Sequence, residues 1–172
     1  MSLFHKLPIE ELTPGRLWSA LDDETRRSAA ASLYRGELPD DSGRREADAA
    51  IASKLRFREV VVRRLPVDKR VGYLVDMRAD DSLAASLLLA LHLDRRKELL
   101  GSFLDRLEVP HRDGVIDDEH EMRSPEREQL IDAVDHLYTE YEADEVDAYL
   151  ATLVAMEPES WEGLVGILRE RR

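Results

Sequence analysis

Residues 80–108 read DDSLAASLLLALHLDRRKELLGSFLDRLE, and this stretch decides the fold class. Its apolar residues recur at spacings of one, three and four, which is the period of an α-helix. Asp80 or Asp81 can cap a first helix that is apolar nearly all round, and Asp94 can cap a second helix with one apolar face. We therefore expect the first helix to lie buried at the centre of the fold, with the second packed beside it.

The same period continues on both sides of this stretch. Helix starts are expected at Thr13-Pro14, at Asp22 or Asp23, and at Ser124-Pro125, Asp144 and Glu157-Pro158. About eight or nine helices with short connections predict an all-α fold of stacked antiparallel helical hairpins, either a short α-solenoid-like array or an irregular bundle. The chain length of 172 residues suits a single domain over 1–172, with 109–124 as its longest internal loop.

Residues 58–77 allow two interpretations. The run FREVVVRRL (57–65) continues an apolar face that starts at Arg44, yet its three valines favour a strand, which RVGYLVDM (70–77) could pair with as a β-hairpin. Leu65-Pro66 breaks the chain, however, and Asp68 can cap a short second helix. We predict helices here and keep the hairpin as the alternative.

Three segments also resemble one another: LDDETRRSAAASLY, LPVDKRVGYLVDM and LDRRKELLGSFLDRL. Each has an apolar residue, then aspartate and arginine, then a leucine-bearing face. Either they are degenerate copies of one helical repeat, or they share only the capping aspartate that amphipathic helices have in common.

Composition excludes several classes of protein. The chain has no cysteine, so disulfides, thiolate metal sites and cysteine nucleophiles are ruled out. No apolar run approaches the roughly 20 residues of a membrane-spanning helix, and the first residues lack the pattern of a signal peptide. Glycine-rich phosphate loops are missing as well. We expect a cytoplasmic protein with no cofactor and no membrane partner.

Charge is the sharpest feature of the sequence. The net charge is −12, but residues 44–78 carry +5 and residues 113–172 carry −13. The large negative field argues against binding nucleic acid. The candidate interaction residues are the basic side chains of Arg56, Arg63, Arg64, Lys69 and Arg70. Either they pair with acidic helices of the same molecule, or they dock an acidic surface of a protein partner or of another copy of the chain.

The loop VPHRDGVIDDEHEMRS (109–124) is the one candidate metal site. Histidine and carboxylate ligands are available from His111, Asp113, Glu119 and His120, but their spacing matches no established metal motif. The simpler interpretation is a solvated loop in which Asp113-Gly114 forms a turn. His136 shares a helix with Asp132, a spacing that helix geometry produces with or without function.

No residue in the sequence is assigned a catalytic role, and we lean towards a protein that is not an enzyme. The sequence thus predicts a non-enzymatic protein-interaction or adaptor module with a charged helical surface. The alternative is a metal-binding or metal-dependent hydrolytic protein that uses the 111–121 loop.

Overall fold

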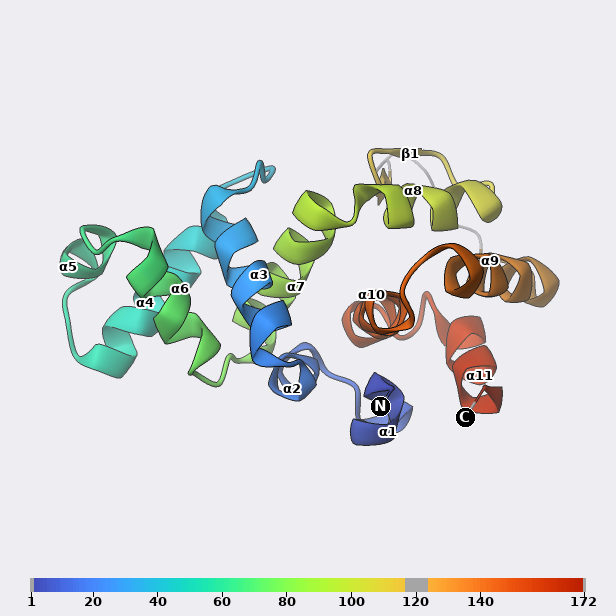
Figure 1. The fold of residues 1–172 in the computed structure, drawn as a ribbon, viewed down its shortest axis with the longest axis horizontal. Helices are drawn as coiled ribbons and strands as arrows, with labels where there is room; N and C mark the ends of the chain where they lie inside the picture. Colours follow the sequence, from blue (N-terminus) through green and yellow to red (C-terminus); the bar gives the residue numbers. More distant parts are fainter. Residues whose placement is uncertain (1, 117–123, 172) are drawn as a thin grey trace. The chain divides into compact units, whose positions relative to one another are not determined.

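The computed structural model describes residues 2–116 and 124–171 (Figure 1). Within this part of the chain there are eleven α-helices, nine of at least seven residues, and one short β-hairpin. The all-α class is therefore confirmed. The chain forms two compact units: residues 14–95, called the middle unit, and residues 1–13 with 96–172, called the terminal unit. The single domain expected over 1–172 stays a prediction.

The middle unit is built around one helix. Its helices are α2 (Pro14–Ala20), α3 (Asp23–Arg35), α4 (Ser42–Leu55), α5 (Glu59–Arg63), α6 (Val67–Val75) and α7 (Asp81–Arg95). Asp80 caps α7 as expected, because its carboxylate accepts the Leu83 amide at 2.9 Å. α7 packs against α2, α3 and α4, and α6 lies against α3 (Figure 1). The nearly all-apolar helix is thus the buried centre of this unit.

The helix expected to continue from Arg44 to Leu65 is interrupted. Arg56 adopts the left-handed conformation, with φ 54°, and ends α4. The Phe57 amide then donates to the Ala52 carbonyl at 3.0 Å. The chain restarts as the short helix α5 and continues into α6, so residues 58–77 form two helices and the β-hairpin alternative is wrong.

The terminal unit joins the two ends of the chain. Its elements are α1 (Leu3–Lys6), the 3₁₀ helix η1 (Ile9–Glu11), α8 (Lys97–Arg106), β1 (His111–Arg112), β2 (Val115–Ile116), α9 (Arg127–Glu140), α10 (Ala143–Met156) and α11 (Glu162–Glu170). Phe103 of α8 is fully buried, with its ring centroid 5.6 Å from that of Tyr149 and 5.8 Å from that of Trp161. Within this unit, α8 packs on α9.

A buried carboxylate links three helices of the middle unit through hydrogen bonds, and we call this cluster the Asp48 clamp. Asp48 of α4 is 5% exposed and accepts the Tyr34 hydroxyl of α3 at 2.8 Å. It also accepts Arg70 of α6 at 3.2 Å, and the Arg70 guanidinium lies 4.5 Å from the centre of the Tyr34 ring. Burial, reinforced by the hydrogen bond to Asp48, raises the pKa of Tyr34 well above its ordinary value. The hydroxyl consequently remains a donor at physiological pH.

The terminal unit contains a second cluster of an aspartate, a tyrosine and an arginine. Asp147 of α10 accepts the Tyr138 hydroxyl of α9 at 2.5 Å, and Arg171 lies 5.2 Å from the centre of the Tyr138 ring. Here the carboxylate also accepts the Ser2 hydroxyl at 2.5 Å and the Leu3 amide at 3.2 Å. This second clamp therefore fastens the start of the chain to α10.

Candidate functional site

The surface around α5 combines exposed apolar and basic side chains. Of the three consecutive valines, only Val62 is buried, because a helix of five residues directs one of them against α4. Val60 and Val61 remain 51% and 43% exposed, and the neighbouring Phe57 is 50% exposed. Large apolar side chains exposed together on a surface mark an interaction site more often than isolated ones do.

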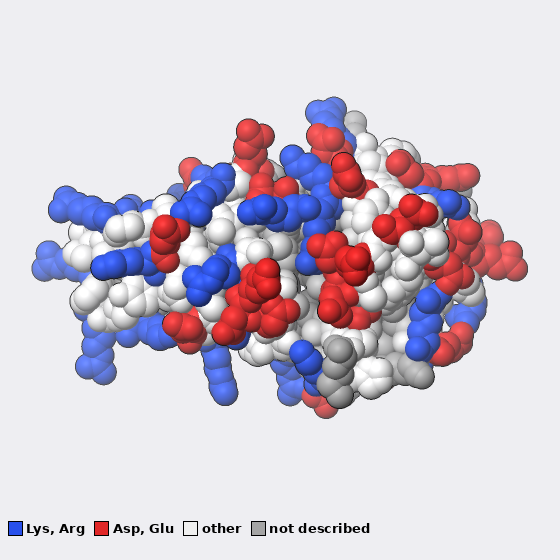
Figure 2. Space-filling view, viewed as in Figure 1, with Lys and Arg blue, Asp and Glu red and all other residues white. Residues whose placement is uncertain are grey.

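Basic residues flank these apolar side chains within nine consecutive residues. We define the α5 patch as Arg56, Phe57, Arg58, Val60, Val61, Arg63 and Arg64. Arg63 pairs with Glu59 at 3.0 Å across one turn of α5. The guanidinium groups of Arg56, Arg58 and Arg64 have no hydrogen bond or ion pair among the residues that the structure describes. Figure 2 shows Lys and Arg side chains gathered over the surface around α4, α5 and α6.

The five predicted interaction residues therefore divide into two groups. Arg56, Arg63, Arg64 and Lys69 are exposed and available to a partner. Arg70 instead belongs to the Asp48 clamp, where its side chain is only 14% exposed. Pairing within the molecule, the simpler interpretation of the basic segment, thus describes Arg70 and, by an exposed pair with Glu59, Arg63, but not Arg56, Arg58 or Arg64.

The predicted turn in the histidine loop is present. His111 pairs with Ile116 and Arg112 with Val115, so two residues, Asp113 and Gly114, connect the strands. Both have positive φ, 52° and 84°, as the tight hairpin turn requires.

Both ring nitrogens of His111 are engaged. The Gly114 amide donates to His111 Nδ1 at 3.1 Å, and His111 Nε2 lies 3.0 Å from an Asp105 carboxylate oxygen. The neutral ring then carries its proton on Nε2 and donates it to Asp105, which leaves no lone pair for a metal in this arrangement.

The other proposed metal ligands do not complete a site in the described residues. Asp113 is exposed in the turn, while Glu119 and His120 lie outside the residues that the structure describes. Across residues 2–116 and 124–171, no three His, Asp or Glu side chains are grouped as a metal ion requires. The metal-dependent alternative receives no support from this part of the chain and stays a prediction.

A serine–histidine contact in the terminal unit was not anticipated from the sequence. Ser102 Oγ lies 2.8 Å from His136 Nε2, and Arg106 lies 3.2 Å from His136 Nδ1 and 3.1 Å from Asp132. A guanidinium only donates, so Nδ1 accepts and the ring proton of the neutral histidine sits on Nε2, facing Ser102. A serine nucleophile needs the opposite arrangement, in which the histidine nitrogen facing the serine accepts its proton and a carboxylate accepts a hydrogen bond from the other ring nitrogen.

The hairpin turn gives a testable prediction. Gly114→Ala is expected to lower the free energy of unfolding by about 2–4 kcal/mol, which urea denaturation measures. Alanine at positive φ is strained, and its Cβ would lie 2.6 Å from the Cβ of Leu100. The matched control is Gly72→Ala in α6, whose Cβ would meet nothing within 4 Å. That change is expected to stabilise the protein by about 0.5–1 kcal/mol, and a loss of the same size in both variants would contradict the prediction.

Comparison of the chain with protein-family models, with curated proteins and with solved structures gives no match. Within the described residues, none of the helices combines the length and the hydropathy needed to cross a membrane. Functional inference therefore rests on the side chains themselves.

Proposed function

We propose that this chain is a non-enzymatic protein-interaction module, an adaptor that docks an acidic protein surface on the α5 patch. The observation that carries the proposal is the exposure of Phe57, Val60 and Val61 beside Arg56, Arg58 and Arg64, whose guanidinium groups have no partner in the described part of the chain. Apolar anchors of this kind supply affinity at the centre of an interface, and arginine is enriched there. The surrounding positive charge speeds encounter with an acidic surface and orients it.

The partner that fits this chemistry is a protein with carboxylates around an apolar depression. Another copy of the chain offers acidic helices too, since residues 113–172 carry −13. The cysteine-free composition supports a cytoplasmic setting as part of the same proposal.

The decisive variant reverses two charges of the patch. Arg63→Glu with Arg64→Glu is expected to abolish capture of the partner in a pull-down at low salt, because like charges then face the acidic surface. Capture by the wild-type protein is expected to weaken as salt is raised. Phe57→Ala, which keeps every charge, is expected to weaken binding by about 1–3 kcal/mol when the captured partner is titrated by calorimetry.

The matched control is Arg45→Glu with Arg78→Glu. Both residues are exposed in the same unit and lie outside the α5 patch, so the change in net charge is identical. This control is expected to retain the partner. Retention of the partner by the Arg63 and Arg64 variant as well would remove the α5 patch from the proposal.

Sedimentation velocity separates the two kinds of partner. A complex whose mass is a multiple of the chain's own 19.7 kDa, formed at low salt and lost in the patch variant, identifies another copy as the partner. A chain that remains monomeric while the pull-down succeeds identifies a different protein.

A further inference from the structure

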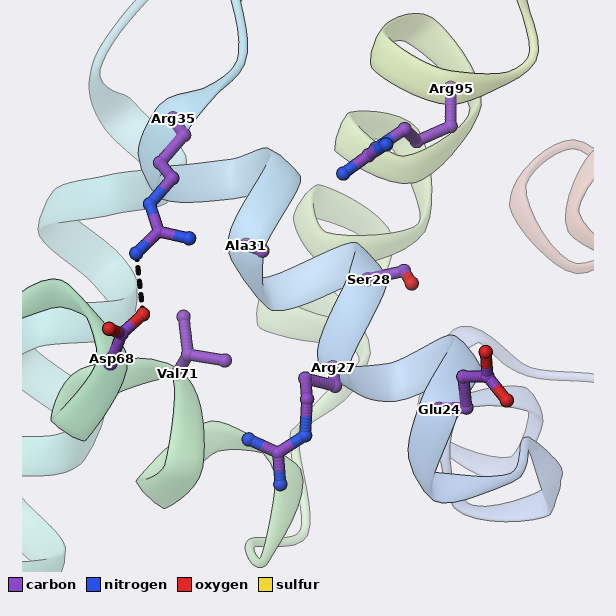
Figure 3. A pocket seen from close by; sticks show the side chains of 8 residues that line it. All are labelled: Glu24, Arg27, Ser28, Ala31, Arg35, Asp68, Val71 and Arg95. Carbon is purple, nitrogen blue, oxygen red and sulfur yellow. Dashed lines mark hydrogen bonds and ion pairs between the residues drawn. The ribbon is translucent and has the colours of Figure 1, made fainter.

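A second basic surface lies in the middle unit, apart from the α5 patch. A cavity of about 330 Å³ opens along α3, between α6 and the end of α7 (Figure 3). The residues that line it are Glu24, Arg27, Ser28, Ala31, Arg35, Asp68, Val71 and Arg95. We call this cavity the arginine groove. Its volume is at the lower end of the range for small-molecule sites.

The groove has an apolar floor and a basic rim. Val71 is 3% exposed and Ala31 is half-buried, so both present packed apolar surface to the cavity. In Figure 3, Arg27 and Arg35 extend on either side of Val71, and Arg95 reaches in from the end of α7. Three guanidinium groups from two helices are thus directed to one small cavity.

The positive charge of the groove is only partly balanced. Arg35 pairs with Asp68, with side chains 57% and 84% exposed, and Arg95 lies 3.4 Å from Asp94. The Arg27 guanidinium has no hydrogen bond or ion pair within the described residues. Exposed pairs of this kind contribute little to stability, so Arg35 can exchange Asp68 for another anion at small cost.

Arginine identifies the class of ligand. Its planar group donates two parallel hydrogen bonds to the oxygens of a phosphate or a carboxylate. The Ser28 hydroxyl also lines the groove and adds a further donor. We propose that the arginine groove binds a small organic anion through a phosphate or carboxylate group, with Arg27 as its principal contact and Val71 and Ala31 against its carbon skeleton.

Two titrations followed by amide NMR test this site on the whole chain. Inorganic phosphate and succinate are added separately at constant ionic strength, with chloride as the reference anion. Saturable shifts at the amides of α3 and α6 with either probe, but not with chloride, are the expected result. The tighter probe identifies the group that the ligand carries. Shifts that grow linearly with both probes, or equally with chloride, would overturn the proposal.

Three single variants make the test specific. Arg27→Gln is expected to weaken binding about tenfold or more, because a charged hydrogen bond is lost. Asp68→Asn is expected to strengthen binding about threefold, since it frees Arg35 and removes a repelling charge. Arg78→Gln, an exposed arginine outside the groove, is the matched control and should bind as the wild type does. Unchanged affinity in Arg27→Gln would refute the site, and circular dichroism verifies that each variant is folded.

Discussion

Replacing Asp48 with alanine is expected to lower the free energy of unfolding by about 3–5 kcal/mol. The variant leaves the Arg70 guanidinium without its carboxylate in a position where the side chain is 14% exposed. It also removes the acceptor of the Tyr34 hydroxyl, so two polar groups of the clamp lose their partner together. Chemical denaturation monitored by circular dichroism measures the effect.

An exposed ion pair of the same chemistry provides the control. Asp68→Ala removes the carboxylate that pairs with Arg35, but that carboxylate is 84% exposed. Water replaces it, and the expected change is at most about 1 kcal/mol. Equal losses of unfolding free energy for Asp48→Ala and Asp68→Ala would show that the burial of the Asp48 clamp does not add to the stability of the protein.

Phe103→Ala is expected to cost about 3–5 kcal/mol, the largest effect in the terminal unit. The ring is fully buried and contacts Tyr149 edge-on, with an angle of 86° between the two ring planes. Truncation leaves a cavity beside Tyr149 of α10 and Trp161, the residue that precedes α11, and Trp161 should change its fluorescence emission.

The same substitution at Phe57 is the matched control. That ring is 50% exposed on the α5 patch, so Phe57→Ala removes little buried area. The expected change in stability is within about 0.5 kcal/mol. A loss as large as that of Phe103→Ala would mean that Phe57 supports the fold and is not free to act as an anchor.

The sequence is sufficient to predict the helical class because the interactions that form and cap helices are local. Periodic leucines and capping aspartates act over a few residues: Asp22, one of the two aspartates that the sequence allows as a cap, accepts the Thr25 amide at 2.7 Å. A backbone hydrogen bond from Thr25 is also the main reason that the pKa of Asp22 is lowered. The helix that covers an apolar face can be distant in sequence, as α9 (Arg127–Glu140) is for α8 (Lys97–Arg106).

Helix boundaries were predicted less well where an unusual residue type marks them. Arg56 ends α4 in a left-handed conformation that glycine or asparagine normally adopts. The helix expected at Ser124-Pro125 begins at Arg127, because Glu126 and Gln129 form a reciprocal capping box. That box is visible in the sequence as Glu-x-x-Gln, and it could have been found.

Only part of the candidate site could be predicted from the sequence. Local charge identified the basic segment, but the sequence does not show which of the three valines is buried, and only the packing of Val62 reveals that Val60 and Val61 are exposed. The separate roles of Arg63 and Arg70 depend on a carboxylate contributed by another helix, Asp48. The spacing of residues along the chain does not predict the contact between Arg70 and Asp48.

Each compact unit contains one of the two tryptophans of the chain, and both indole rings are almost completely buried. Trp18 lies in the middle unit and Trp161 in the terminal unit. When tryptophan is excited selectively, a chain with Trp161→Phe therefore reports on residues 14–95, and a chain with Trp18→Phe reports on the other part. Coincident melting curves for these two chains would mean that a single cooperative transition joins both ends of the polypeptide to its middle.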